Sequence, residues 1–174
     1  MDVAALLLEL YGRIPPLAAE AVAGLDADDL CWSPEPGTNP IGWLVWHATR
    51  VQDHHVSELL GSDQVWVAGD RARSFGLTPD PDDVGYGHTP DQVHAVRATG
   101  PDVLVAYHRA VDARTSDFLA GLTATALDAV VDTRWDPPVT LGVRLVSVAD
   151  DSLQHMGQAA YLRGLLDRFR ADRG

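Results

Sequence analysis

The chain has 174 residues, a formal net charge of −12 and no lysine, so every basic residue is an arginine. This length is typical of one domain with a sizeable core, and we predict a single domain over residues 1–174. The strong negative charge opposes binding to nucleic acid, because phosphate backbones are also anionic. No apolar run reaches the roughly 20 residues that a membrane-spanning helix needs, which argues against a membrane protein.

The cysteine count and the first residues bear on the compartment. Cys31 is the only cysteine, so no disulfide can form within the chain, and a reducing compartment is indicated. The apolar run 3–10 follows Asp2 rather than a basic segment, so it lacks the pattern of a secretory signal. We therefore predict a cytoplasmic protein.

The first predicted element is a helix over about residues 2–24. Apolar residues recur in it at steps of three and four, in a stripe of Val3, Leu6, Leu10, Ile14, Leu17, Ala21 and Leu25. Pro15 and Pro16 interrupt the pattern, so we expect a kink or a break there.

The second predicted helix ends the first half of the chain. Asn39 has the character of an N-cap, Pro40 suits the first helical position, and Gly61 is expected to end the helix after Leu60. Residues 61–100 are rich in Gly, Pro and Asp and contain only short helical candidates. An irregular stretch of this length is more often a functional lid than a spacer.

Two further helices complete the predicted fold. The third opens at Pro101 and ends near Leu122, and the fourth runs from about Thr140 almost to the C-terminus. Ser152 and His155 occupy positions of the fourth apolar stripe that packing alone would make apolar. Four long helices, with a long crossover between the second and the third, predict an all-α four-helix bundle.

A faint internal repeat relates the two halves. Residues 24–30 resemble residues 121–127, and each segment is followed by a Trp-x-Pro sequence. A helix that opens with Ile41-Gly42 or Leu141-Gly142 comes next. The chain therefore looks like two helical pairs around a pseudo-twofold axis, with a site between the second and fourth helices drawing on both.

Three polar residues on these two helices suggest a metal site. Asp151 and His155 are four positions apart, so they lie on one helical face, and His47 lies beside the apolar stripe of the second helix. Bundles build metal sites from such residues on facing helices, and two imidazoles with one carboxylate leave positions open for water or substrate. The same spacing fits a buried Asp–His pair without a metal, and His54 is a reserve ligand.

The segments 39–47 and 155–164 resemble the DinB/YfiT-like superfamily, and the similarity extends over nearly the whole chain. Within it, the chain is most similar to the actinobacterial mycothiol-transferase-type branch. The superfamily binds a metal through one His of the second helix and a His-x-x-x-His pair of the fourth, so the resemblance implies His47 and His155 as ligands. Asp151 stands where the pair has its first His, which makes the site harder and more anionic, and two roles are open for it: a ligand, or a residue that holds a ligand in position.

The resemblance also implies an activity. It implies a divalent metal, zinc or nickel, and metal-dependent S-transfer of a small-molecule thiol, which would be mycothiol, to a small electrophile. Tyr86 and His88 in the crossover could close over a substrate, or contribute to local packing. Arg163 could bind a carboxylate or pair with an acidic neighbour. Cys31 has no obvious activating partner and is not expected to be the nucleophile.

Two other functions remain open at this stage. One is a non-catalytic, metal-stabilised stress-response or binding module. The other is a metal-dependent hydrolase, because the same open site could activate water. The expected partners are the thiol and the electrophile, with neither nucleic acid nor a membrane, and a homodimer is left open.

Overall fold

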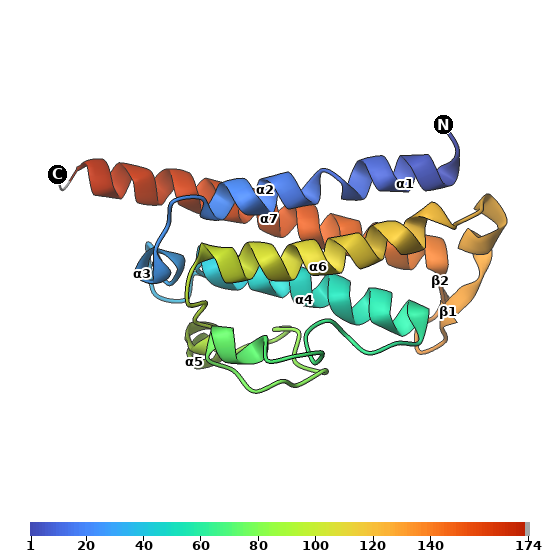
Figure 1. Cartoon of the computed structure of the whole chain (residues 1–174), viewed down its shortest axis with the longest axis horizontal. Helices are drawn as coiled ribbons and strands as arrows, with labels where there is room; N and C mark the ends of the chain where they lie inside the picture. The colour runs from blue at the N-terminus through green and yellow to red at the C-terminus, as the bar shows by residue number, and fades with distance from the viewer. Residues whose placement is uncertain (173–174) are drawn as a thin grey trace.

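The structure is a computed structural model that describes residues 1–172. Four helical rods lie side by side (Figure 1). They are α1 (Val3–Tyr11) with α2 (Ile14–Val22), α4 (Ile41–Leu60), α6 (Pro101–Ala120) and α7 (Leu141–Ala171). The rods α4 and α6 run in one direction, and the other two run in the opposite direction (Figure 1). The prediction of an all-α four-helix bundle with a long crossover is confirmed.

The first rod is broken slightly earlier than predicted. Helix α1 ends at Tyr11, and residues 12–13 connect it to α2. Pro15 and Pro16 therefore lie in the first turn of α2 rather than at the break. A proline is tolerated there because the first amide groups of a helix have no partner within the helix.

The predicted apolar stripe of this rod was right for Ile14, Ala21 and Leu25, which are buried, and wrong for Leu6 and Leu17. Leu6 and Leu17 are 57% and 38% exposed, whereas Leu7 and Tyr11 are buried. The Tyr11 hydroxyl donates to the carbonyl oxygen of Leu145 (2.7 Å), which fastens α1 to α7. Nearly every residue of α1 is apolar, so several stripes were available, and packing, mainly against α6, selected one.

Helix α4 begins one residue later than predicted. Its N-cap is Pro40, which offers no side-chain hydrogen bond, so the assignment of Asn39 as the cap was wrong. The short helix α3 (Ala27–Leu30) lies against this end: a Cβ on Gly42 would come within 2.9 Å of the Leu30 carbonyl oxygen. Glycine is thus needed there for close packing. The predicted end at Leu60, followed by a left-handed Gly61, is confirmed.

The internal repeat has a structural counterpart at the start of α7. A Cβ on Gly142 would lie 3.3 Å from Leu127 of the 3₁₀ helix η2 (Ala124–Asp128), much as Gly42 packs on Leu30. These are the residues that the sequence repeat aligns. The two helical pairs therefore use the same kind of contact to start α4 and α7.

A small hairpin before α7 was not predicted. Its strands, β1 (Val130–Asp132) and β2 (Val139–Thr140), pair antiparallel. Thr140 then caps α7, since its side chain accepts a hydrogen bond from the amide of Val143. The start of the last helix near Thr140 is as predicted.

The crossover between α4 and α6 contains η1 (Ala72–Phe75) and α5 (Pro90–Ala95) and lies along the outer side of α4 (Figure 1). Asp53 of α4 is buried and fastens its beginning. The carboxylate of Asp53 accepts hydrogen bonds from the amides of Val65 (2.9 Å) and Trp66 (2.8 Å) and from the Tyr107 hydroxyl (2.8 Å).

Arg50 of α4 fastens the middle of the crossover. Its guanidinium is fully buried, 3.6 Å from the Asp53 carboxylate, and donates to the carbonyl oxygens of Asp80, Pro81 and Asp83. A buried charge is tolerated only when it is paired and hydrogen-bonded, and here the backbone of the crossover supplies the hydrogen bonds. The segment is thereby held against the bundle.

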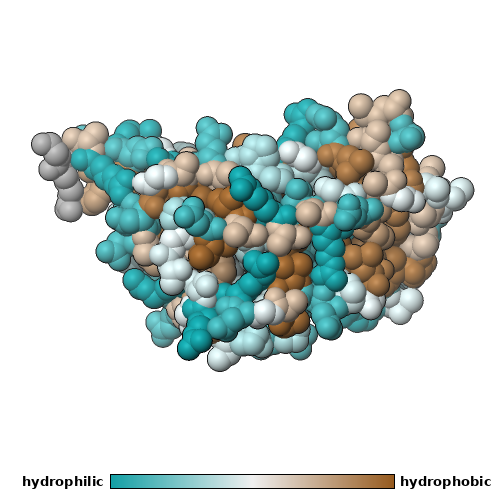
Figure 2. Space-filling view, viewed as in Figure 1, coloured by the Kyte–Doolittle hydropathy of each residue, from teal (hydrophilic) through white to brown (hydrophobic). Residues whose placement is uncertain are grey.

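The surface carries several large apolar side chains. Figure 2 shows that polar residues are spread over this face and that apolar residues are most continuous near the end where α1 begins. The exposed apolar residues include Leu6 in α1 and Val143 and Val146 in the first turns of α7. Across residues 1–172, no helix is long and apolar enough to cross a membrane. A homodimer remains a prediction.

The buried His108 of α6 makes stability depend on pH. Its Nδ1–H donates to the Thr49 hydroxyl (3.1 Å), which itself donates to Val45, while Nε2 has no partner within the described part of the chain. Burial lowers the pKa of His108 to about 4. The unfolded chain, with a histidine pKa of about 6.5, therefore binds more protons between these two values.

The free energy of unfolding should thus fall as the pH is lowered through this window, by up to about 1.4 kcal/mol per pH unit from His108 alone. Urea denaturation of the metal-free protein between about pH 7 and pH 5 measures this, and His108→Gln should show a shallower loss than the wild type. The exposed His94→Gln is the matched control. Equal slopes for wild type and His108→Gln would contradict the assignment.

Candidate metal centre

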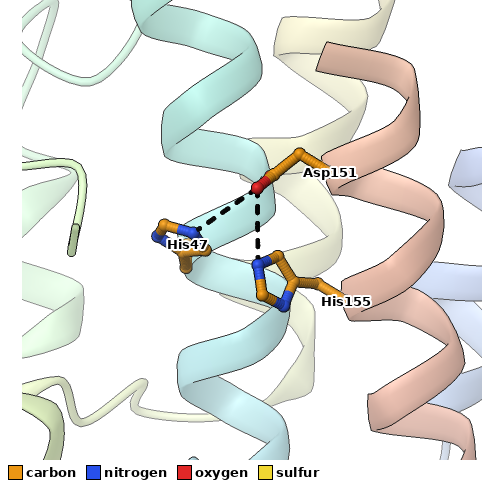
Figure 3. A group of neighbouring side chains, drawn as sticks. All are labelled: His47, Asp151 and His155. Carbon is orange, nitrogen blue, oxygen red and sulfur yellow. Dashed lines mark ion pairs between the residues drawn. The ribbon is translucent and has the colours of Figure 1, made fainter. Parts of the chain in front are cut away.

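The three predicted ligands converge at one point between α4 and α7. His47 comes from α4, and Asp151 and His155 come from α7 (Figure 3). Oδ1 of Asp151 is 3.9 Å from Nε2 of His47 and 3.5 Å from Nε2 of His155. One ligand-type atom from each residue lies within 4.8 Å of the other two. The spacing that singled them out in the sequence thus corresponds to a real cluster.

Hydrogen bonds fix which nitrogen of each imidazole faces the cluster. Nδ1 of His47 is 2.5 Å from the carbonyl oxygen of Val84, and Nδ1 of His155 is 3.0 Å from Oε1 of Gln158. Both oxygens can only accept, so each Nδ1 carries the proton and each Nε2 presents its lone pair. Metal-binding histidines are oriented in this way, with one nitrogen held by an oxygen and the other left for the ion.

Asp151 shows that the cluster is incomplete as it stands. Its Oδ2 atom is buried and has no hydrogen-bond partner among residues 1–172. An unsatisfied buried carboxylate oxygen is costly, and a cation beside it would remove the cost. The donor set of two imidazoles and one carboxylate fits a divalent ion such as zinc or nickel.

The two histidines differ in protonation. Burial is the main influence on His47 and lowers its pKa, whereas the hydrogen bond to Asp151 raises the pKa of His155. His47 is therefore held neutral, the form that binds metals. A proton on His155 and a metal ion would compete for the same nitrogen.

A close fit at Gly85 holds the Val84 carbonyl in place. Gly85 has a φ of +86°, and a Cβ there would lie 2.8 Å from the Trp46 ring and 2.9 Å from Nδ1 of His47. The ring of Trp43 stacks on the His47 imidazole, 4.6 Å between centroids. His47 is thus held between Trp43 and the crossover backbone, and only glycine fits at position 85.

Tyr86 and His88 have different roles in the structure. Tyr86 lines a cavity of about 270 Å³ together with His47 and Asp151, and its role toward a substrate stays a prediction. His88 instead hydrogen-bonds Asp83 through Nε2 (2.8 Å) and accepts from the Trp43 indole through Nδ1 (3.2 Å). It does not line this cavity, and its contacts are those of a residue that braces the crossover.

Arg163 and His54 are not brought to the cluster. Arg163 donates to the carbonyl oxygen of Ala23 (2.6 Å) and pairs with Asp167, so it joins α7 to the end of α2. His54 lies in a second group with His55 and Glu58, further along α4. The reserve ligand therefore belongs to another part of the surface.

Cys31 ends the short helix α3 and is half-buried. Burial raises the pKa of its thiol, which keeps it protonated and unreactive. This agrees with the expectation that Cys31 is not the nucleophile.

Two supporting groups were missed by the sequence reasoning. Gln158 lies three residues after His155, so helical spacing could have paired them. The role of the Val84 carbonyl could not be predicted from the sequence, because every residue has a backbone carbonyl group. The close fit at Gly85 was missed as well, because a glycine in a sequence does not show what packs around it.

The fold and the cluster define a helical-bundle protein with a candidate metal centre between two helices. The family model described as mycothiol-S-transferase matches residues 17–168. The chain therefore belongs to the mycothiol S-transferase family, a DinB-like family, as its sequence motifs indicated.

A solved structure supports the same fold. The crystal structure of a conserved protein from Enterococcus faecalis is similar to this chain with a TM-score of 0.87 and 34% sequence identity. The similarity covers 95% of this chain and 98% of that one. A comparison with curated proteins finds no match.

Removing the carboxylate of Asp151 should weaken metal binding. We expect Asp151→Ala to lower the affinity for zinc or nickel about tenfold to a hundredfold or more, and a His47→Ala, His155→Ala double variant to purify without metal. Competition with a chromophoric chelator measures the affinity. Asp150→Ala is the matched control, because Asp150 is exposed and accepts only from Gln154. Unchanged affinity in Asp151→Ala would remove Asp151 from the site.

A methyl group at position 85 should disturb the site indirectly. Gly85→Ala is expected to displace the Val84 carbonyl from His47 and to reduce metal affinity, because the imidazole loses its fixed orientation. Gly87→Ala is the control: Gly87 also has a positive φ, but a Cβ there meets nothing within 4 Å. Equal metal affinity in the two variants would show that the close fit does not matter.

Proposed function

We propose that the protein is a metal-dependent thiol S-transferase that joins mycothiol to a small electrophile. The observation that carries the proposal is the cluster of His47, Asp151 and His155, two of which, His47 and Asp151, line a cavity of about 270 Å³. Membership of a family named for mycothiol S-transfer supports the thiol as co-substrate. The lone cysteine suits a reducing compartment, and we place the protein in the cytoplasm.

The cluster would hold one zinc or nickel ion through Nε2 of each histidine and the Asp151 carboxylate. A divalent ion there supplies a Lewis acid that lowers the pKa of a thiol toward neutrality. The chain orients the imidazoles through Val84 and Gln158, so the site is arranged before any substrate enters. Such pre-arrangement avoids reorganisation during the reaction.

The cavity walls suit the second substrate. Val51, Val84 and Val148 make part of the lining apolar, and Tyr86 stands at the edge. A small apolar electrophile would pack against the valines, away from water, which protects it from hydrolysis. In the transfer, the sulfur bonds to the electrophilic carbon, the leaving group departs with its electron pair, and the thiol proton passes to solvent.

Two alternatives make different predictions from the same site. A hydrolase would use water in place of the thiol and would need no thiol for turnover. A binding module would hold metal and a ligand without turnover. The family match favours the thiol over water, and the open cavity beside the cluster favours a bound small molecule over a purely structural ion.

Thiol binding to cobalt-substituted protein tests the proposal. Mycothiol should change the cobalt spectrum and release a proton, with an apparent thiol pKa well below the free value of about 8.5. Turnover of a model electrophile should require thiol and be lost in His47→Ala. Turnover without thiol would instead indicate a hydrolase. An unchanged spectrum with mycothiol and with simpler thiols would leave the binding module as the better account.

A further inference from the structure

A larger hollow lies beside the metal cavity, toward the hairpin. It measures about 720 Å³ and shares His55, Val84 and Tyr86 with the smaller cavity. Its far end is lined by Arg134, Trp135 and Arg144. Because the two hollows share three lining residues, they lie next to each other. We call the larger one the outer groove.

Two aromatic side chains border the outer groove and are open to solvent. Tyr86 is 92% exposed and Trp135 is 65% exposed, whereas Trp43, Trp46 and Trp66 are all buried. Large aromatic faces left in water are costly and often mark a binding surface. Beside a hollow, such rings offer flat platforms for another ring that is apolar on its faces and polar at its edge.

The charged groups of the outer groove nearly cancel. Asp132 binds both guanidiniums, at 2.8 Å from Arg134 and 2.8 Å from Arg144. Asp82 and Asp83 line the other side. With both arginines already paired, no excess positive charge is available for a phosphate or another anion.

The same arginines oppose a second cation in this region. His54, His55 and Glu58 are close enough to bind one. However, Arg144 is 3.3 Å from Nε2 of His55, and Arg134 is 4.0 Å from Glu58. A cation between these histidines would face two guanidiniums, so the groove suits neither ion class.

With anions and cations excluded, an uncharged polyol is the class of ligand that fits the outer groove. Hydroxyl groups donate and accept hydrogen bonds at once, and the carboxylates and guanidiniums of the outer groove offer partners of both kinds. A sugar ring also has apolar C–H faces that can stack on Trp135 and Tyr86. The volume lies within the range of small-molecule sites, whereas a simple thiol would need only the inner cavity.

We propose that the outer groove binds the sugar part of the thiol co-substrate, with Trp135 as its main stacking platform. The inference rests on the proposed function: if the sulfur of the thiol co-substrate reaches the metal cluster, the outer groove is where the remainder of that co-substrate binds. Mycothiol has this form: an N-acetylcysteine joined to a glucosamine–inositol unit. The thiol would enter the inner cavity while both rings lie toward the hairpin.

A pair of thiols tests the inference on cobalt-loaded protein. Mycothiol should bind more tightly than N-acetylcysteine, which has the same thiol without the sugars. Trp135→Ala should raise the Kd for mycothiol about three- to tenfold and leave the Kd for N-acetylcysteine unchanged. Tyr161→Ala, which removes an equally exposed aromatic ring outside the groove, should change neither. If Trp135→Ala leaves both affinities unchanged, the inference is overturned while the transferase stands.

A second measurement separates the groove from the metal chemistry. Glucosaminyl-inositol, which has no thiol, should shift the amide resonances of residues lining the outer groove in metal-free wild type, but not in Trp135→Ala. If this probe binds while no thiol changes the cobalt spectrum, the groove is supported and the proposed transferase is refuted. Displacement of mycothiol by millimolar inorganic phosphate would show an anion site and overturn the polyol assignment.

Discussion

The buried pair Arg50 and Asp53 is the constraint on which the rest of the structure depends. Removing two charges from water is costly, and the cost is offset only if every remaining hydrogen-bonding position is filled. Here the crossover backbone fills most of them, from the amides of Val65 and Trp66 to the carbonyl of Asp83, and the Tyr107 hydroxyl of α6 adds another. If the crossover left α4, the pair would lose these backbone hydrogen bonds. These contacts hold the crossover against α4 although most of it has no regular secondary structure.

The geometry of the candidate metal centre depends on these contacts between the crossover and α4. Val84 directly follows Asp83, whose carbonyl oxygen accepts from Arg50, and its own carbonyl oxygen orients His47. His47 is therefore aligned by a hydrogen bond to a segment that α4 itself holds in place. The expected lid is consequently anchored on both sides of Val84, by Arg50 before it and by the His88–Trp43 hydrogen bond after it. Tyr86 lies between these two anchors, and its exposed side chain lines the cavity.

Helical spacing carried most of what the sequence could predict. It placed α4, α6 and α7 and put Asp151 and His155 on one face, because periodicity reports which side of a helix is buried. It failed for Leu6 and Leu17, where a nearly all-apolar run offers no single stripe. Backbone groups such as the Val84 carbonyl have no sequence signature. Arg163 pairs with Asp167, which was one of the two predicted alternatives, but its hydrogen bond to the Ala23 carbonyl has no sequence signature.

The paired glycines at the starts of α4 and α7 have a consequence for the origin of the cavity. Gly42 and Gly142 are 100 positions apart, and the same offset relates His55 to His155, Val51 to Asp151 and His47 to Ser147. His55, Val51 and Ser147 all line the cavity next to the cluster. Duplication of a helical pair would leave two equivalent corners facing each other across one axis. In this chain one corner has two imidazoles and a carboxylate, and its twin has become the wall that a substrate would touch.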